Sequence, residues 1–176
     1  MVSVLLGKIS LNKISIGFSK RNNNLISWLI RKIDNVDYSH VYIRRNSKYG
    51  EYVYQASGLE VNFTNIKTFL DHNQIVEEYE FELTDEQLDK LLIFCIKHVG
   101  KPYNMKDLFL IAANILTKKL NINLGLKGDG DETFKCSELG AMLVQDILNI
   151  EIAENEDFIT PSELNPYIKD HGKQIF

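Results

Sequence analysis

The chain has 176 residues, of which 44% are hydrophobic and 25% charged, and a formal net charge of -4. These values are typical of a soluble globular protein, and the length suffices for one domain with a substantial core, which we place over 1–176. The acidic balance gives no reason to expect nucleic-acid binding, and no stretch approaches the roughly 20 apolar residues of a membrane span.

The N-terminal stretch and the number of cysteines bear on where in the cell the chain is located. Lys8 and Lys13 interrupt the mildly apolar N-terminal stretch too early for the core of a signal peptide. Two cysteines, Cys95 and Cys136, are too few for a disulfide framework or a zinc cluster, and their scarcity suits a reducing environment. We therefore expect a cytoplasmic location; if a phage encodes the chain, association with the virion is the alternative.

The first half of the chain alternates strand patterns with short turns. Apolar and polar residues alternate over 13–19, as in a half-buried strand. The stretches 38–45 and 51–56 also read as strands and flank a turn at 46–50, which predicts a β-hairpin. The other expected elements are an amphipathic helix over 25–33 with caps at 22–24 and an end at 34–35, a short strand over 59–63, a short helix over 64–72 capped by Thr64, and a strand over 74–83.

The second half is mainly helical. Thr84 and Gln87 match a capping box, which predicts a helix from this point to Gly100, with Cys95 in its apolar stripe. Strands and helices are partly segregated, so we expect an α+β fold rather than repeated βαβ units. The remaining expected elements are a helix over 106–116, a glycine-containing loop over 120–131, a helix that opens near Cys136 and reaches Leu148, a short capped helix with Pro161 at its first position, and a tail over 169–176 that can add an edge strand.

Cys136 is the first candidate for a chemical role. The residues from Leu139 to Leu148 have helical periodicity, and Thr133 fits an N-cap. The sulfur would then lie in the first helical turn, where unpaired backbone N–H groups and the helix dipole favour a thiolate, the nucleophile of cysteine chemistry. A free cysteine is more often a small buried hydrophobe, so the assignment requires a histidine nearby.

His40 is the histidine best placed to act as a base. It lies inside a predicted strand, where a rigid sheet can aim the imidazole at a nucleophile. His72 and His171 lie in positions typical of surface residues, and His98 lies near a helix C-terminus, where a cation suits the dipole.

The predicted hairpin supplies a partner for this histidine. If the turn is centred between Ser47 and Lys48, antiparallel pairing sets His40 opposite Gln55, and directly paired residues have Cβ atoms about 4.5–5.5 Å apart. Gln55 would then accept a hydrogen bond from one imidazole nitrogen and leave the other for the sulfur, as the orienting member of a triad. A register slip of one residue would move Gln55 to the other face, where it would be an ordinary polar residue.

Five short motifs follow one another in an order that resembles a known family. Together they are similar to the circularly permuted NlpC-type papain-like cysteine hydrolases, especially the YiiX-like branch, in which the histidine strand precedes the cysteine helix. The resemblance covers roughly 14 to 164. The motifs are Tyr38-Ser39-His40-Val41-Tyr42-Ile43, Tyr54-Gln55-Ala56-Ser57-Gly58-Leu59-Glu60-Val61, Gly100-Lys101-Pro102-Tyr103-Asn104, Phe134-Lys135-Cys136-Ser137-Glu138-Leu139 and Thr160-Pro161-Ser162-Glu163-Leu164.

The resemblance implies a papain-like α+β fold, with an antiparallel sheet packed against helices and the nucleophile at the N-terminus of a helix. The chain departs from the family in two places. Gln55 stands where a glutamate is common and cannot stabilise an imidazolium by charge, and Tyr42 stands where glycine is common, which would narrow or reshape the cleft. The implied site residues are catalytic Cys136, His40 and Gln55, and substrate-binding Tyr103, Tyr42 and Ser137.

The leading expectation is therefore a cysteine hydrolase that cleaves an amide or a related acyl bond through a thioester. Cys136 attacks the carbonyl carbon, His40 moves the protons, and the backbone N–H of Cys136 supplies part of an oxyanion hole. The expected partner is a peptide or amide substrate, with peptidoglycan peptides as one candidate, and no metal or organic cofactor is required. Two alternatives stay open: a lipid acyl hydrolase or acyltransferase similar to lecithin–retinol acyltransferase, and a non-catalytic papain-fold protein with a structural or host-interaction role in a phage.

Overall fold

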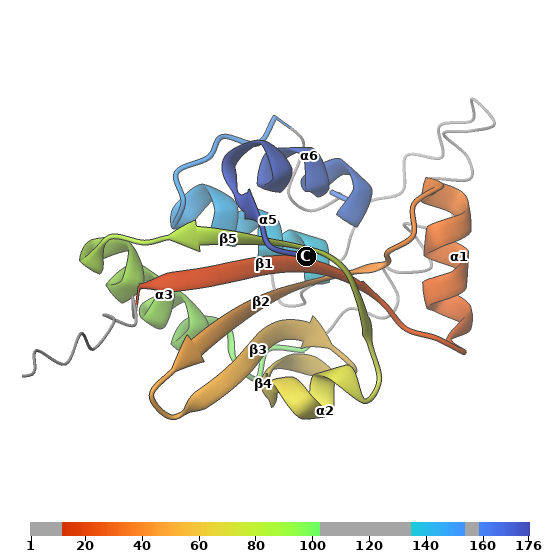
Figure 1. Ribbon diagram of the computed structural model, residues 1–176, viewed down its shortest axis with the longest axis horizontal. Coiled ribbons are helices and arrows are strands. Elements are labelled where there is room, and N and C mark those ends of the chain that lie inside the picture. Colours follow the sequence, from red (N-terminus) through yellow and green to blue (C-terminus); the bar gives the residue numbers. More distant parts are fainter. Residues whose placement is uncertain (1–11, 103–134, 154–158) are drawn as a thin grey trace, which may run out of the picture.

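The computed structural model describes residues 12–102, 135–153 and 159–176. Within these ranges six antiparallel strands form one sheet in the order β4-β3-β2-β1-β5-β6, with helices packed against it (Figure 1). The strands are β1 Lys13–Lys20, β2 His40–Ser47, β3 Gly50–Ser57, β4 Glu60–Asn65, β5 Gln74–Glu82 and β6 Lys173–Gln174. The helices are α1 Leu25–Asp34, α2 Ile66–Leu70, α3 Asp85–His98, α5 Cys136–Asp146 and α6 Pro161–His171. The expected α+β class with an antiparallel sheet is confirmed, whereas the helix expected over 106–116 and the loop over 120–131 lie outside the described residues.

Alternation along the strands divides the apolar side chains between the two faces of the sheet. The larger core lies between one face and helices α3, α5 and α6, and it contains Ile16, Val41 and Leu139. The smaller core lies on the other face, where Tyr42 packs with Phe69 of α2. Val41 and Tyr42 are consecutive residues of β2, so both cores meet this strand from opposite sides.

Side-chain caps begin α3 and α6 where the sequence indicates. Thr84 and Gln87 form the predicted capping box of α3, and Thr160 and Glu163 form the corresponding one of α6. Helix α6 has 11 residues and is longer than the short helix expected there. The tail that follows adds β6 beside β5 at the edge of the sheet, as expected.

The helix expected over 64–72 is shorter and has a different cap. Thr64 pairs with Val53 inside the β3–β4 ladder, so it remains in a strand. Helix α2 begins at Ile66, and Asn65 Oδ1 accepts a hydrogen bond from the backbone N–H of Lys67 at 3.0 Å. Thr64 remains paired in the strand, and Asn65 takes the capping role, because asparagine is at least as good an N-cap as threonine.

The β2–β3 hairpin forms, but its register differs from the predicted one. Ser47 pairs with Gly50, so the turn consists of Lys48 and Tyr49. Gly50 has a φ of 125°, a backbone conformation that other residues rarely adopt, and this fixes the turn one residue further along than expected. Moving the centre of a hairpin by one residue shifts every cross-strand pair by two.

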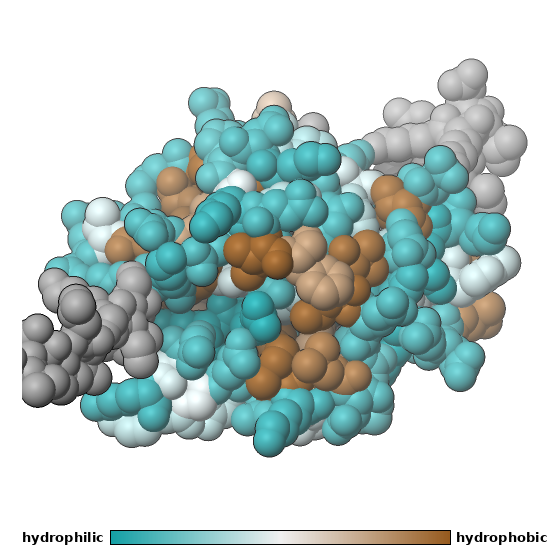
Figure 2. Space-filling model, viewed as in Figure 1, coloured by the Kyte–Doolittle hydropathy of each residue, from teal (hydrophilic) through white to brown (hydrophobic). Residues whose placement is uncertain are grey.

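The surface in Figure 2 is mostly polar, with apolar side chains gathered in one patch near the middle of the face. The exposed apolar residues of the chain include Leu70, Ile175 and Phe176. In the ranges that the structure describes, no helix is both long enough and apolar enough to cross a membrane.

Candidate active site

His40 and Gln55 lie side by side on one face of the sheet. His40 is the first residue of β2, and Gln55 lies near the end of β3. His40 Nε2 is 2.8 Å from Gln55 Oε1, which is a hydrogen-bond distance. The predicted contact between these two residues is therefore confirmed.

The contact forms even though the predicted pairing is wrong. In the observed register Ile43 pairs with Tyr54 and Ser47 with Gly50. Continued to the start of β2, this register places His40 opposite Ser57. Gln55 is two residues away from that position, and alternate residues of a strand share a face. The two side chains are thus diagonal neighbours, a separation that the long glutamine side chain can span.

A chain of polar groups orients the Gln55 amide. Gln55 Nε2 donates to Thr64 Oγ1 at 3.4 Å, and Thr64 Oγ1 donates to Asn62 Oδ1 at 2.9 Å. With its nitrogen directed at Thr64, the amide presents its oxygen to His40, and a carbonyl oxygen only accepts. The proton of the neutral imidazole therefore lies on Nε2, and Nδ1 keeps the lone pair that a general base needs.

Helix α5 places Cys136 against the strand that begins with the histidine. Cys136 lies in the first turn of α5, as predicted, and is its first residue. The N-cap is Lys135, and the predicted N-cap Thr133 lies outside the described residues. The helix lies very close to the strand, since a Cβ added at Gly140 would lie only 3.1 Å from Val41 Cγ1. Glycine at this position lets the helix that carries the thiol pack tightly on β2.

The Cys136 thiol is buried among backbone donors. Only 8% of the residue is exposed, and the backbone N–H groups of Val41, Ser137 and Cys136 favour the thiolate form. Burial raises the pKa of the thiol, and these donors oppose that rise without cancelling it. The backbone donors at the helix start thus act in the expected direction, but desolvation is the larger effect and leaves the pKa of the resting thiol raised.

Two of the three predicted catalytic residues make a direct polar contact. Among the described residues, the hydrogen-bonding neighbours of the sulfur are backbone amides, and the imidazole bonds to Gln55. Because Val41 follows His40 directly, the thiol lies near the backbone of β2 one residue from the histidine. The structure thus joins His40 to Gln55 and brings Cys136 to the neighbouring residue.

The His40 imidazole is neutral at neutral pH. Burial lowers its pKa to about 4, the hydrogen bond to Gln55 opposes this shift, and the positive charge of Arg21 adds to it. With the thiol pKa raised and the imidazole pKa lowered, the resting pair consists of a thiol and a neutral base.

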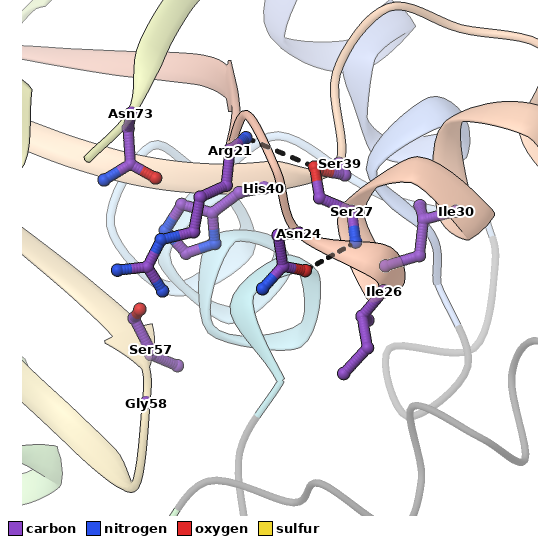
Figure 3. A pocket seen from close by; sticks show the side chains of 11 residues that line it. Arg21, Asn24, Ile26, Ser27, Ile30, Ser39, His40, Ser57, Gly58 and Asn73 are labelled. Atoms are coloured by element: carbon purple, nitrogen blue, oxygen red, sulfur yellow. Dashed lines mark hydrogen bonds between the residues drawn. The ribbon is translucent and has the colours of Figure 1, made fainter.

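A pocket of about 200 Å³ lies beside His40 (Figure 3). Its walls come from the loop after β1, the first turns of α1, the start of β2, the end of β3 and the loop before β5. In Figure 3 the side chain of Arg21 extends into the space between His40 and Ser57, with Asn73 on one side. The pocket therefore offers a substrate group access to the imidazole.

Tyr42 does not line this pocket. The residue is fully buried, its ring lies 4.7 Å from that of Phe69, and a Cβ at Gly17 would collide with it. Tyr42 is therefore not placed to make the predicted substrate contact, because its ring fills the smaller core. Gly17 is the small residue that makes room for it.

The Ser137 hydroxyl is also occupied in packing. Ser137 is buried, and its Oγ donates to the backbone carbonyl of Ile159 at 2.6 Å, which ties the start of α5 to the segment before α6. This hydroxyl is an anchor for the helix rather than the predicted substrate contact. Tyr103, the other predicted substrate-binding residue, lies outside the described residues.

Arg21 is a site residue that the sequence did not predict. Its closeness to His40 depends on a hydrogen bond of 2.6 Å between the hydroxyls of Ser27 in α1 and Ser39, which fixes the loop before α1 beside the start of β2. The sequence shows only a basic residue just after the first predicted strand. Sequence spacing does not reveal that this residue lies beside the strand that carries His40.

Comparison with known proteins places the fold. No protein-family model matches the chain, and no curated protein matches it in sequence. Among solved structures, the crystal structure of metalloprotein yiiX from Escherichia coli matches with a TM-score of 0.57 and 18% identity, over 93% of this chain and 87% of that chain. The chain has a YiiX-like fold. At this identity the likeness concerns the fold alone.

Proposed function

We propose that the protein is a cysteine hydrolase of amide or related acyl bonds, with Cys136 as nucleophile, His40 as base and Gln55 as orienting residue. The observation that carries the proposal is the hydrogen bond of 2.8 Å between His40 and Gln55, which leaves Nδ1 of the ring as a proton acceptor. Cys136, at the start of α5, meets the backbone of the next residue along β2.

Each step of the reaction moves one proton and exchanges one bond. The thiol proton of Cys136 passes to His40 Nδ1 while the sulfur bonds to the carbonyl carbon. As the resulting oxyanion collapses, the bond from carbon to the leaving nitrogen breaks, and His40 gives its proton to that nitrogen. His40 then takes a proton from water, the hydroxide attacks the thioester, and the acid leaves as the proton returns to the sulfur.

The backbone N–H groups around the sulfur also suit the oxyanion. The N–H of Cys136 lies within reach of its own sulfur, close to where the attacked carbonyl oxygen would be. Removal of one such donor typically costs about 100- to 1,000-fold in rate. Because the resting thiol and imidazole are both neutral, His40 acts as a general base during attack and not as one half of a stored ion pair.

The fold neighbour is described as a metalloprotein, which raises the question of a metal in this chain. In the described ranges no group of three or more His, Cys, Asp and Glu side chains lies together as metal ligands would. His40 Nδ1 and the Cys136 sulfur are two potential donors, fewer than the three protein ligands of a catalytic zinc site. These residues do not fit a metal site, and no step of the proposed reaction passes through a metal.

A substrate panel tests the proposal. Wild type, Cys136→Ala, His40→Ala and, as control, Cys95→Ala are incubated with peptides, peptidoglycan fragments and phospholipids, and products are identified by mass spectrometry. We expect amide hydrolysis by wild type and Cys95→Ala, and loss by at least about 100-fold in the other two. Equal turnover by Cys136→Ala would contradict the proposal, and hydrolysis of phospholipids alone would favour the lipid acyl alternative.

A further inference from the structure

We propose that the pocket beside His40 binds a carboxylate of the substrate through Arg21, so that the enzyme prefers peptides with a carboxylate-bearing residue next to the scissile bond. The inference rests on the proposed function, because only that function makes the pocket the neighbour of a reacting amide.

The position of Arg21 relative to His40 is fixed by buried hydroxyl groups. The backbone N–H of Arg21 donates to Ser27 Oγ at 3.2 Å, and Ser27 Oγ is 2.6 Å from Ser39 Oγ. Ser27 and Ser39 are both buried, and Ser39 immediately precedes His40. Asn24 caps the helix behind this loop by accepting from the backbone N–H of Ser27 at 2.8 Å. Arg21 therefore starts from a rigid point beside the imidazole.

Among the described residues, the pocket has a positive charge and no negative one to balance it. None of the 11 residues that line it is acidic, and Arg21 is the charged one, since His40 is neutral at neutral pH. The neighbouring basic residues Lys20 and Arg31 both pair with Asp37, whereas no ion pair of the described chain includes Arg21. The guanidinium is left to bind an anionic group from outside.

The chemistry of the walls favours a carboxylate on a short side chain. A guanidinium presents a planar fork of N–H groups that matches the two oxygens of a carboxylate. Asn73 and Ser57 add neutral polar groups near the fork (Figure 3), and Ile26 and Ile30 form an apolar side suited to methylene groups. A volume of about 200 Å³ accommodates one amino-acid residue and falls below the roughly 300 Å³ at which pockets for larger ligands begin.

A binding measurement tests the site without relying on catalysis. N-acetylglutamate α-amide and N-acetylglutamine α-amide differ only in a carboxylate against an amide, and inorganic phosphate stands for a phosphate group such as a lipid headgroup. Each is titrated into wild type, Arg21→Gln and Lys20→Gln while the imidazole signals of His40 are followed by NMR. Lys20→Gln is the matched control, because Lys20 is the neighbouring cation but does not line the pocket.

We expect the glutamate compound to shift the His40 signals saturably in wild type and in Lys20→Gln. Affinity should fall roughly 3- to 10-fold for the glutamine compound, and by the same factor for the glutamate compound in Arg21→Gln, as suits an exposed charge-assisted contact. Equal affinity for the two compounds, or an unchanged affinity in Arg21→Gln, would overturn the inference. Tighter binding of phosphate than of the glutamate compound would also overturn it.

A second arm separates this inference from the proposed function. Cys136 is alkylated with iodoacetate and with iodoacetamide, which differ by a carboxylate, and we expect the ratio of the iodoacetate rate to the iodoacetamide rate to fall in Arg21→Gln. Division by the iodoacetamide rate cancels the effect that loss of the Arg21 charge has on the pKa of His40. An unchanged ratio would overturn the inference and leave the proposed function standing. Carboxylate binding with the expected dependence on Arg21, together with a Cys136 inert to both reagents, would sustain the site and overturn the proposed hydrolase.

Discussion

Gln55 holds the imidazole as a neutral acceptor, which sets the electrostatics of the whole site. A carboxylate in place of Gln55 would stabilise an imidazolium by its charge. The neutral amide does not, so burial is the larger effect and lowers the pKa of His40 to about 4. The site therefore stores a neutral base next to a neutral thiol. In the proposed reaction, attack by Cys136 therefore requires transfer of its proton to His40.

Replacement of Gln55 tests this reasoning. Gln55→Glu should raise the pKa of His40 by roughly 1–3 units, because a nearby negative charge favours the imidazolium, and should shift Cys136 alkylation to lower pH. Gln55→Leu should leave Nε2 without an acceptor and slow alkylation over the whole pH range. NMR titration of His40 and three pH–rate curves measure both effects. Identical His40 titrations in the three proteins would refute the orienting role.

Thr64 is a positioning residue in the same network, since it accepts from the Gln55 amide nitrogen. Thr64→Val keeps the shape but removes the hydroxyl, and a lost hydrogen bond of about 1 kcal/mol corresponds to a roughly 5-fold slower alkylation of Cys136. Thr64→Ser should restore the wild-type rate and the Nε2-protonated tautomer, which ¹⁵N chemical shifts report. A wild-type rate and tautomer in Thr64→Val would show that the network does not orient the ring.

At the scale of elements, the packing of α5 on β2 determines where the thiol lies. A Cβ at Gly140 would lie 2.9 Å from Leu164 Cδ2 and 3.1 Å from Val41 Cγ1, so Gly140→Ala must push the helix or its neighbours aside. We expect a loss of about 1–3 kcal/mol in the free energy of unfolding, measured with urea. Asp89→Ala, on the exposed side of α3, is the control and should change stability by less than about 0.5 kcal/mol. A Gly140→Ala protein as stable as wild type would mean that this contact is not tight.

The same scale shows how far the sequence predicts the structure. Strand alternation and the Thr84–Gln87 capping box depend on neighbouring residues, and both elements form, although the strand expected to be half-buried is buried on both faces between β2 and β5. The hairpin register depends on which residues make the turn. The positive φ of Gly50 places the turn at Lys48 and Tyr49, one residue further along than predicted. The predicted contact between His40 and Gln55 is still made, because the predicted pairing was wrong by two residues and a shift of two leaves both side chains on the same face of the sheet.

Site properties that depend on tertiary burial were not visible in the sequence. The helix start predicted a low pKa for Cys136, but the sulfur is enclosed by the strand and helix that it joins, and burial raises that pKa. Arg21 was missed because its position depends on hydroxyl contacts between α1 and the residue before β2. In both cases the deciding neighbours come from other elements of the fold.

At the scale of the whole molecule, buried histidines make stability depend on pH. The folded state resists protonation of His40, whose pKa is about 4, while the unfolded chain takes up a proton near the ordinary value of 6.5. Between these values the unfolded state binds more protons, so stability is fully present above about pH 6.5 and falls as the pH falls towards 4. Buried His98, whose pKa is also lowered, acts in the same direction, and Glu78, whose pKa is raised, opposes it.

His40→Gln isolates the contribution of this imidazole. Urea unfolding at pH 7 and pH 5 should show a smaller acid-induced loss in His40→Gln than in wild type, because the variant has no proton to gain at that position. His171→Gln, at an exposed histidine, should show the wild-type loss. The same loss in His40→Gln as in wild type would mean that the imidazole is protonated as easily in the folded chain as in the unfolded one.

The central claim is that Cys136 is a nucleophile activated by His40, and competitive alkylation of the two cysteines tests it most directly. Both thiols are buried, but Cys95 lies on the core-facing side of α3 and burial raises its pKa to about 12, whereas backbone amides oppose the rise at Cys136. In the proposed site His40 is the base for Cys136. Iodoacetamide labelling of the folded protein, read by peptide mass spectrometry, should modify Cys136 at least about tenfold faster than Cys95, because the thiolate is the reactive form and backbone donors favour it at Cys136. His40→Ala should abolish the difference without changing the melting curve, and His171→Ala should preserve it. Faster labelling of Cys95, or a Cys136 rate unaffected by His40→Ala, would contradict the account.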